Sequence, residues 1–220
     1  MNTTKHFITV AGNIGVGKST LTKLIAKKMN WEPIFEPFEE NPFLENFYQD
    51  MSRWGFHSQI FFLSKRLQQH YYLLQQSESI VQDRSIYEDA EIFARNLYIQ
   101  RIISEREWQT YYNFYKTLST LLKPPDLVVY LRGTVSTLLR RIVKRGREYE
   151  ANISNEYITN LNALYDEWVH NFSVCPVLTI ETDHLNFVED DTHLLQIAQK
   201  IQDRLYGKDK IILRGEEGKS

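Results

Sequence analysis

The sequence predicts an α/β fold in which helices flank a parallel sheet, and two observations lead to this prediction. Short apolar runs alternate with longer stretches of helical character, which is the pattern of parallel strands joined by helices. The first apolar run also leads into a glycine-rich loop and then a helix, an order typical of phosphate-binding loops. A chain of 220 residues can bury one substantial core, so we expect a single domain over residues 1–206.

Five apolar runs are expected to form the strands: Phe7–Ala11, Pro33–Glu36, Ile80–Asp83, Leu127–Leu131 and Val177–Ile180. Helices are expected near Ser19–Met29, Asn41–Met51, Arg53–Ser77, Ser85–Ile99, Ser104–Leu122, Thr134–Lys144, Asn155–Asn171 and Asp190–Leu205. Pro124 and Pro125 end the helix before the fourth strand, because neither residue has an amide hydrogen to donate. From Gly207 onward the sequence is charged and punctuated by glycine, which predicts a flexible tail over residues 207–220.

The loop after the first expected strand is a complete phosphate-binding motif. Its glycines let backbone N–H groups turn toward nucleotide phosphates, Lys18 can reach the outer phosphates, and the Ser19 hydroxyl can ligate magnesium. The helix that follows directs its N-terminal dipole at the same anion. The alternative is a chance glycine-rich turn, and the order of strand, loop and helix argues against it. The residues expected to bind the nucleotide are Gly12, Asn13, Ile14, Gly15, Val16, Gly17, Lys18, Ser19 and Thr20.

Composition and charge favour a compact globular protein that binds a free nucleotide. Hydrophobic residues make up 42% and charged residues 25%, with a formal net charge of −2. Proteins that bind nucleic acids or membrane surfaces usually have a strong basic bias, so neither partner is expected. The chain has no apolar signal segment and no stretch of roughly 18 apolar residues, which predicts a cytoplasmic protein. Its only cysteine, Cys175, is expected to be a buried thiol, and its histidines show no metal-ligand spacing.

Charged residues lie at the carboxyl ends of the second and third expected strands. Glu36 and Pro37 come at the end of the second strand, and Asp83 and Arg84 at the end of the third. Open parallel sheets bind ligands at the carboxyl ends of their strands, so these side chains are expected beside the phosphate loop. There a carboxylate can accept the proton of an attacking hydroxyl, and an arginine can neutralise charge on a transferred phosphoryl group. Asp83 has two interpretations, a cap for the next helix or a member of the magnesium shell.

Several arginines lie at the end of the helix expected over Thr134–Lys144. The ordinary interpretation of such a cluster is a solvated helix face. Gly146 lies between Arg145 and Arg147, however, and makes a bendable segment suited to folding over phosphates and excluding water. We therefore expect a lid at about residues 145–151.

Five motifs, in order along the chain, carry a resemblance to a known family. They are the phosphate loop, the pair Glu36-Pro37 followed by residues 40–43, residues 53–59 (RWGFHSQ), residues 82–89 (QDRSIYED) and the lid. Together they resemble the deoxyribonucleoside kinases, which include the deoxycytidine and deoxyguanosine kinases, and especially the bacterial deoxyadenosine/deoxycytidine kinase branch. The resemblance runs from about residue 6 to residue 205.

The resemblance implies a P-loop kinase fold with a five-stranded parallel sheet and an arginine-rich lid. The implied activity is ATP-dependent 5′-phosphorylation of deoxyribonucleosides in nucleoside salvage, with Mg²⁺ as cofactor and ATP or another NTP as phosphate donor. It also implies a homodimer built on long helices, and the helices expected over Arg53–Ser77 and Ser85–Ile99 are long enough to form one.

The resemblance further implies which side chains take part in phosphate transfer. Glu36 matches the base that activates the nucleoside 5′-hydroxyl, and Arg84 matches the arginine that holds it. Asp83 matches a magnesium-associated acid beside Ser19. The lid arginines that approach the donor phosphates are Arg141, Arg145 and Arg147.

The implied nucleoside contacts lie on three segments. Tyr48 and Glu150 match the pair that hydrogen-bonds the sugar 3′-hydroxyl. Gln59 matches the side chain that reads the base edge, and Phe93 matches an aromatic residue that packs on the base face. A core position is the alternative for Phe93. Asn41 stands where animal members have tryptophan, and no role is transferred to it.

Base preference depends on Arg66 and Asp89, which match an arginine–acid pair of deoxycytidine and deoxyguanosine kinases that thymidine-accepting relatives lack. The carboxylate accepts hydrogen bonds but cannot donate them, which favours a base that carries an amine. Gln59 alone does not decide, because its amide can flip. We expect deoxyadenosine and deoxycytidine as acceptors, with deoxyguanosine as the alternative.

Two other protein classes share parts of this pattern. A nucleoside monophosphate kinase would share the fold and lid, but it needs a cation near the acceptor phosphate, where this chain has Glu36. A regulatory GTPase would carry Asp-x-x-Gly and Asn-Lys-x-Asp motifs, which the sequence lacks. Donor preference, the ranking of the nucleosides and feedback by deoxynucleoside triphosphates stay open at this level.

Overall fold

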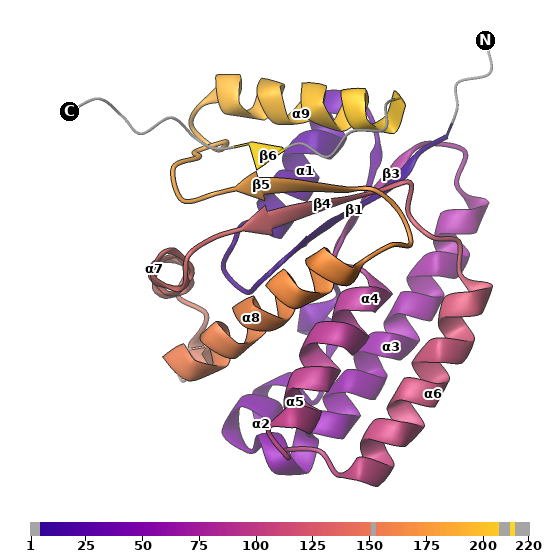
Figure 1. The fold of residues 1–220 in the computed structure, drawn as a ribbon, viewed down its shortest axis with the longest axis vertical. Helices are drawn as coiled ribbons and strands as arrows, with labels where there is room; N and C mark the ends of the chain where they lie inside the picture. Colours follow the sequence, from indigo (N-terminus) through magenta and orange to yellow (C-terminus); the bar gives the residue numbers. More distant parts are fainter. Residues whose placement is uncertain (1–4, 151–152, 207–211, 214–220) are drawn as a thin grey trace.

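A parallel sheet forms the centre of the molecule (Figure 1), and the expected α/β fold is confirmed. The computed structural model describes residues 5–150, 153–206 and 212–213. Within them the strand order is β2-β3-β1-β4-β5-β6. The strands are β1 (Phe7–Gly12), β2 (Glu32–Ile34), β3 (Ile80–Asp83), β4 (Leu127–Arg132), β5 (Val177–Glu181) and β6 (Ile212–Leu213). The two residues of β6 add a short parallel edge next to β5, within the stretch expected to be a tail.

Helices cover both faces of the sheet, which explains why all six residues of β1 are buried. In Figure 1, α1 and α9 lie on one face, whereas α3, α6 and α8 lie on the other. The helices are α1 (Lys18–Met29), α2 (Leu44–Gln49), α3 (Met51–Gln75), α4 (Ile86–Glu88), α5 (Arg95–Ile99), α6 (Glu105–Leu121), α7 (Val135–Arg145), α8 (Asn155–Asn171) and α9 (Asp191–Tyr206). None of the helices in the described ranges is both long and apolar enough to cross a bilayer.

The second strand is shorter than predicted. It ends at Ile34, which pairs with Gln82, so that Glu36 lies beyond the strand. Continued pairing would need an extended residue at position 84, but Arg84 has a left-handed φ of 67° and donates its N–H to the Val10 carbonyl at 3.0 Å. Because β3 ends at Asp83, the segment with Glu36 has no neighbouring strand to pair with.

Two predicted helices are also interrupted. The helix expected over Asn41–Met51 begins only at Leu44, because Asn41 precedes a proline and adopts an extended conformation. Asp50 then accepts a hydrogen bond from the Arg53 N–H at 3.1 Å and starts α3 as a separate helix. The helix expected over Ser85–Ile99 contains a π-helical segment, Asp89–Ala94, between α4 and α5.

Cys175 differs from its prediction as well. The residue is only partly buried, because it lies in the turn just before β5. Its surroundings are nevertheless apolar enough that burial raises the pKa of the thiol to about 12, so the thiol stays protonated at neutral pH.

Candidate active site

The phosphate loop lies at the carboxyl end of β1 and has the conformation that its glycines allow. Gly12 and Gly15 have φ values of 143° and 82°, and a Cβ at either position would lie within 2.8 Å of a backbone oxygen. Lys18 is buried and donates to the Asn13 carbonyl at 3.1 Å. Burial and the nearby Arg84 lower its pKa to about 8, although neighbouring carboxylates oppose the shift. A bound phosphate would favour the charged form of this lysine.

Glu36 lies between two arginines at the mouth of the sheet. Its Oε1 is 3.0 Å from Arg84 Nε and 3.5 Å from Arg66 Nη2, and its side chain is 16% exposed. Burial opposes ionisation of the carboxyl, but attraction to Arg84, Arg66 and Lys18 outweighs it and holds the pKa of Glu36 below its ordinary value. The carboxylate is therefore ionised at neutral pH and able to accept a proton.

Arg84 contacts an aromatic ring in addition to the carboxylate of Glu36. Its guanidinium carbon lies 4.0 Å from the centre of the Phe93 ring. The residue also adopts a left-handed backbone conformation, which is uncommon outside glycine and tends to occur at functional sites. Phe93, predicted to pack on a base, thus supports Arg84 as well as lining the cavity described below.

Ser19 and Asp83 meet beside the phosphate loop. The Ser19 hydroxyl donates to Asp83 Oδ2 at 2.5 Å, while Asp83 Oδ1 is buried without a hydrogen-bond partner among the described residues. Burial raises the pKa of Asp83 above its ordinary value, and attraction to Lys18 only partly offsets this shift. Hydroxyl and carboxylate oxygens are ligands that Mg²⁺ prefers, and this ion usually takes one or two protein oxygens together with phosphates and water. The two residues therefore fit a magnesium ion, and the free carboxylate oxygen is the position at which it would bind.

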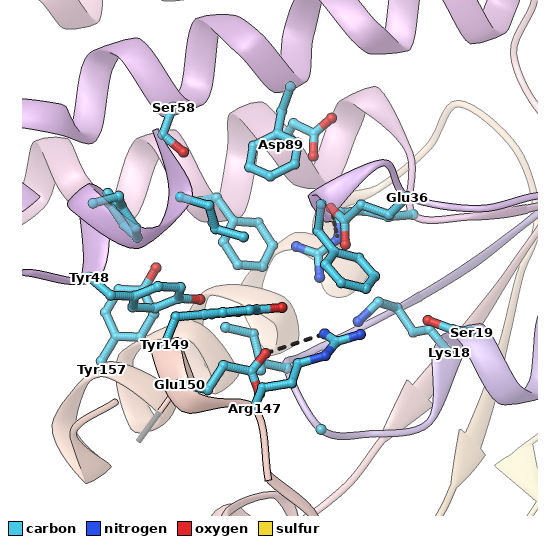
Figure 2. A pocket seen from close by; sticks show the side chains of 18 of the residues that line it. Lys18, Ser19, Glu36, Tyr48, Ser58, Asp89, Arg147, Tyr149, Glu150 and Tyr157 are labelled. Carbon is cyan, nitrogen blue, oxygen red and sulfur yellow. Dashed lines mark hydrogen bonds and ion pairs between the residues drawn. The ribbon is translucent and has the colours of Figure 1, made fainter. Parts of the chain in front are cut away.

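A cavity opens next to Glu36 and the phosphate loop (Figure 2), with about 750 Å³ of empty space when the open solvent at its mouth is included. Its lining includes Tyr48, Gln59, Asp89, Phe93 and Glu150, which are five of the predicted nucleoside contacts. Gln59 is buried, and its amide has no hydrogen-bond partner among the described residues. The amide is therefore available to a ligand in the cavity.

Arg66 does not itself line this cavity, but it pairs with Asp89, which does. The Arg66 Nε lies 2.8 Å from Asp89 Oδ2, and both side chains are at most 3% exposed. For Arg66, burial lowers the pKa, but attraction to Asp89 and Glu36 outweighs burial and the pKa is raised. For Asp89, burial raises the pKa, and attraction to Arg66 only partly offsets this shift. Asp89 is the first residue of the π-helical segment.

The lid arginines differ in their contacts. Arg145 and Arg147 line the cavity, and both pair with the carboxylate of Glu150. The Arg147 guanidinium also lies 3.8 Å from the centre of the Phe38 ring. Arg141 contacts the phosphate loop instead, because it donates to the Val16 carbonyl at 3.0 Å and to the Thr182 carbonyl at 2.8 Å. Residue 151 of the predicted lid lies outside the described residues.

Glu88, for which the sequence predicted no role, links the phosphate loop to the segment that follows β3. It is fully buried and accepts hydrogen bonds from the N–H groups of Gly12 at 3.1 Å and Ser85 at 2.9 Å. The Tyr165 hydroxyl lies 2.9 Å from its carboxylate and 2.8 Å from the Gly12 carbonyl oxygen. The signal in the sequence is the spacing of Ser85 and Glu88, which is that of a capping box.

Asn41 has a local structural role. Its amide donates to the Ser58 hydroxyl at 3.0 Å, and its oxygen accepts the Phe43 N–H at 3.0 Å. These bonds attach the start of α2 to α3, next to the cavity. Tyr149 is a further cavity residue without a predicted role.

The chain is similar to known proteins in both sequence and structure. A family model described as deoxynucleoside kinase matches residues 8–205. Deoxyadenosine/deoxycytidine kinase from Bacillus subtilis (strain 168) is 36% identical over 205 residues, which are 92% of this chain and 94% of that protein. Deoxyguanosine kinase from Lactobacillus acidophilus is 33% identical over 207 residues, 90% of each chain. The structure of deoxyadenosine kinase from M. mycoides with bound dATP has a TM-score of 0.79 and 33% identity, and the match covers 89% of this chain and 99% of that one.

Proposed function

Because this chain belongs to the deoxynucleoside kinase family, we propose that it phosphorylates the 5′-hydroxyl of deoxyadenosine and deoxycytidine, with deoxyguanosine as the alternative acceptor. The observation that carries the proposal is the ionised Glu36 carboxylate, which lines one cavity together with Lys18 of the phosphate loop. A proton acceptor for an alcohol and a cation for the donor phosphates thus lie on two sides of the same space.

The proposed reaction is an in-line transfer from ATP or another nucleoside triphosphate. Glu36 accepts the proton of the 5′-hydroxyl as the 5′-oxygen forms a bond to the γ-phosphorus. The bond from that phosphorus to the bridging oxygen breaks, and the nucleoside diphosphate leaves with the electron pair. Arg84 and Lys18 neutralise the negative charge on the phosphoryl oxygens. Arg145 and Arg147 are proposed to join them from the lid, whereas Arg141 acts through its bonds to the phosphate loop.

Ser19 and Asp83 are proposed to hold a magnesium ion at the donor phosphates. The ion would neutralise phosphate charge when bound. Asp83 Oδ1, buried and without a partner among the described residues, supports this assignment. We also propose that the enzyme acts in the cytoplasm.

The base preference rests on the polar groups at the back of the cavity. Gln59 can donate to a ring nitrogen and accept from an exocyclic amine, which suits adenine and cytosine. Asp89 can accept from a base amine while Arg66 balances its charge at 2.8 Å. Relatives named as deoxyadenosine/deoxycytidine and deoxyguanosine kinases support the same group of acceptors.

A phosphorylation panel tests this proposal. ATP and Mg²⁺ are supplied with each common ribonucleoside, deoxynucleoside and deoxynucleoside monophosphate in turn. Deoxyadenosine and deoxycytidine should be phosphorylated most efficiently. Preferred use of a monophosphate would instead indicate a nucleoside monophosphate kinase, which Glu36 disfavours because a carboxylate repels the acceptor phosphate.

The sugar site leads to a prediction about 2′,3′-dideoxynucleosides. Tyr48 and Glu150 lie on the same side of the cavity (Figure 2) and are proposed to bind the 3′-hydroxyl. Removal of that hydroxyl leaves a buried polar group unpaired, which costs about 1–3 kcal/mol, so kcat/KM should fall roughly 5- to 150-fold. The measurement compares dideoxyadenosine with deoxyadenosine. Equal efficiency would show that these residues do not bind the 3′-hydroxyl.

We propose that the homodimer forms through a second, aromatic groove between α5, α6 and α8, so that α5 of the expected helix Ser85–Ile99 takes part and α3 does not. It is lined by rings that include Tyr98, Trp108 and Phe172, and Ile99 at its edge is 56% exposed. Light scattering should give about twice the chain mass of 26.1 kDa. Ile99→Asp should shift the protein toward the monomer, while Val143→Asp, at an 80% exposed position outside the groove, should not. A monomer in the parent would refute the dimer.

A further inference from the structure

The Tyr149 hydroxyl is a buried polar group that the proposed reaction has not used. Its oxygen is inaccessible to solvent and has no hydrogen-bond partner among the described residues. Most buried side-chain polar groups in folded proteins are hydrogen-bonded. The unpaired buried hydroxyls among the described residues are those of Thr9, Thr22, Tyr111 and Tyr149, and of these four only Tyr149 lines the cavity, where a ligand can supply the partner.

The position of Tyr149 limits what this partner can be. The residue lies on the lid, next to Glu150, and its ring stacks on the ring of Tyr48 with a centroid distance of 5.8 Å and an interplanar angle of 23°. Figure 2 shows its hydroxyl pointing away from Tyr48 and across the cavity, toward the side that holds Lys18, Glu36 and Arg147. The hydroxyl is thus directed at the space between the sugar pocket and the phosphate loop.

The hydroxyl acts as a hydrogen-bond donor there. Burial raises the pKa of Tyr149 above its ordinary value, and Arg147 only partly offsets that effect, so the phenol is protonated at neutral pH. Of the three charged groups on that side, Lys18 and Arg147 are also donors, and Glu36 is the proposed acceptor of the 5′-hydroxyl proton. A group that accepts from Tyr149, Lys18 and Arg147 must be an anion or an oxygen with several lone pairs, and a phosphoryl group fits this description.

We propose that Tyr149 donates a hydrogen bond to the phosphoryl group as it reaches the 5′-oxygen, and then to the 5′-phosphate of the product. This inference rests on the proposed kinase function. The phenol keeps its proton throughout, because the 5′-hydroxyl proton goes to Glu36 and the electron pair of the broken bond leaves with the nucleoside diphosphate. Tyr149 would thus contact the group that is transferred, and Tyr48 would contact the sugar.

Tyr149→Phe tests the proposal, because phenylalanine keeps the ring and its stacking on Tyr48 but removes the donor. The variant should bind deoxycytidine monophosphate about tenfold more weakly than the parent and have a kcat about tenfold lower, as expected for one lost hydrogen bond to a charged group. Its affinity for deoxycytidine should stay within about twofold, since the nucleoside has no phosphate. Isothermal titration calorimetry gives both affinities.

Tyr48→Phe is the matched control, because it removes the other hydroxyl of the stacked pair. It should reduce the discrimination between deoxyadenosine and dideoxyadenosine, whereas Tyr149→Phe should leave that ratio unchanged. Equal weakening of nucleoside and monophosphate binding by Tyr149→Phe, or no weakening of either, would overturn the inference. A parent protein that phosphorylates no deoxynucleoside would overturn the proposed function instead, so the two failures are distinguishable.

Discussion

Glu36→Gln is expected to lower kcat by about 10²–10⁴-fold, the usual contribution of a general base. The amide keeps the shape of the side chain, and its oxygen can still lie next to Arg84, whose Nε is 3.0 Å from the carboxylate in the parent. It cannot accept the proton of the 5′-hydroxyl. Deoxynucleoside affinity should therefore change much less than turnover.

Single-turnover phosphorylation and equilibrium nucleoside binding together measure this separation. Glu45→Gln is the control, because it makes the same chemical change at an exposed position on α2 outside the cavity. Near-normal turnover in Glu36→Gln would remove Glu36 from the role of base. Loss of binding together with turnover would mean that the carboxylate mainly holds Arg84 and Arg66 in place.

Asp89→Ala has the second-largest expected effect, because it leaves the buried guanidinium of Arg66 without its partner at 2.8 Å. Removing one member of a buried ion pair costs roughly 3–5 kcal/mol of the free energy of unfolding, and we expect the lower end of that range. Arg66 still has Gln69 at 3.0 Å and Glu36 at 3.5 Å. A closer approach of Arg66 to Glu36 would also disturb the proposed base, so activity should fall too.

Removing both charges should be milder than removing one. Arg66→Met with Asp89→Ala replaces the pair by apolar groups, which in buried pairs is often close to neutral for stability. Chemical denaturation measures both variants. Glu40→Ala is the control, because it breaks the exposed pair between Lys65 and Glu40 and should change stability by less than about 1 kcal/mol.

The same double variant should change base selection. Without the Asp89 carboxylate, a keto oxygen no longer faces a group that can only accept, and Gln59 can flip its amide to meet thymine. The thymidine-to-deoxycytidine ratio of kcat/KM should rise at least about tenfold, which corresponds to about 1.4 kcal/mol. A ratio within about twofold of the parent would show that the pair does not read the base.

Local sequence patterns were enough to predict the strands of the sheet and the phosphate loop. They could not predict features that depend on contacts between residues far apart in the sequence. The loop from Gly12 to Ser19 needs only its own glycines and the strand before it, and strand and helix periodicity placed the elements around it. The early end of β2 at Ile34 depends on the left-handed turn of Arg84, which lies 50 residues further along the chain. No local rule contains that information.

The site shows the same division. Glu36, Gln59 and Asp89 come from three segments, and motif resemblance rather than periodicity brought them together in the prediction. The π-helical segment that begins at Asp89 has no signal in a sequence that reads as a continuous helix. Arg141 illustrates the limit of the resemblance. The motif match predicted that Arg141 approaches the donor phosphates, but it did not predict the hydrogen bond from its guanidinium to the carbonyl of Val16 in the phosphate loop.

The shared carboxylate of Glu150 has a consequence for how the two substrates influence each other. Arg145 and Arg147 both pair with it, and it is also the proposed partner of the sugar 3′-hydroxyl. A nucleoside that engages Glu150 weakens its hold on the two arginines and leaves them freer to meet the donor. Thermodynamic reciprocity then requires the donor to tighten nucleoside binding by the same factor. If Glu150 binds the sugar as proposed, this one acidic side chain makes the two binding events mutually reinforcing.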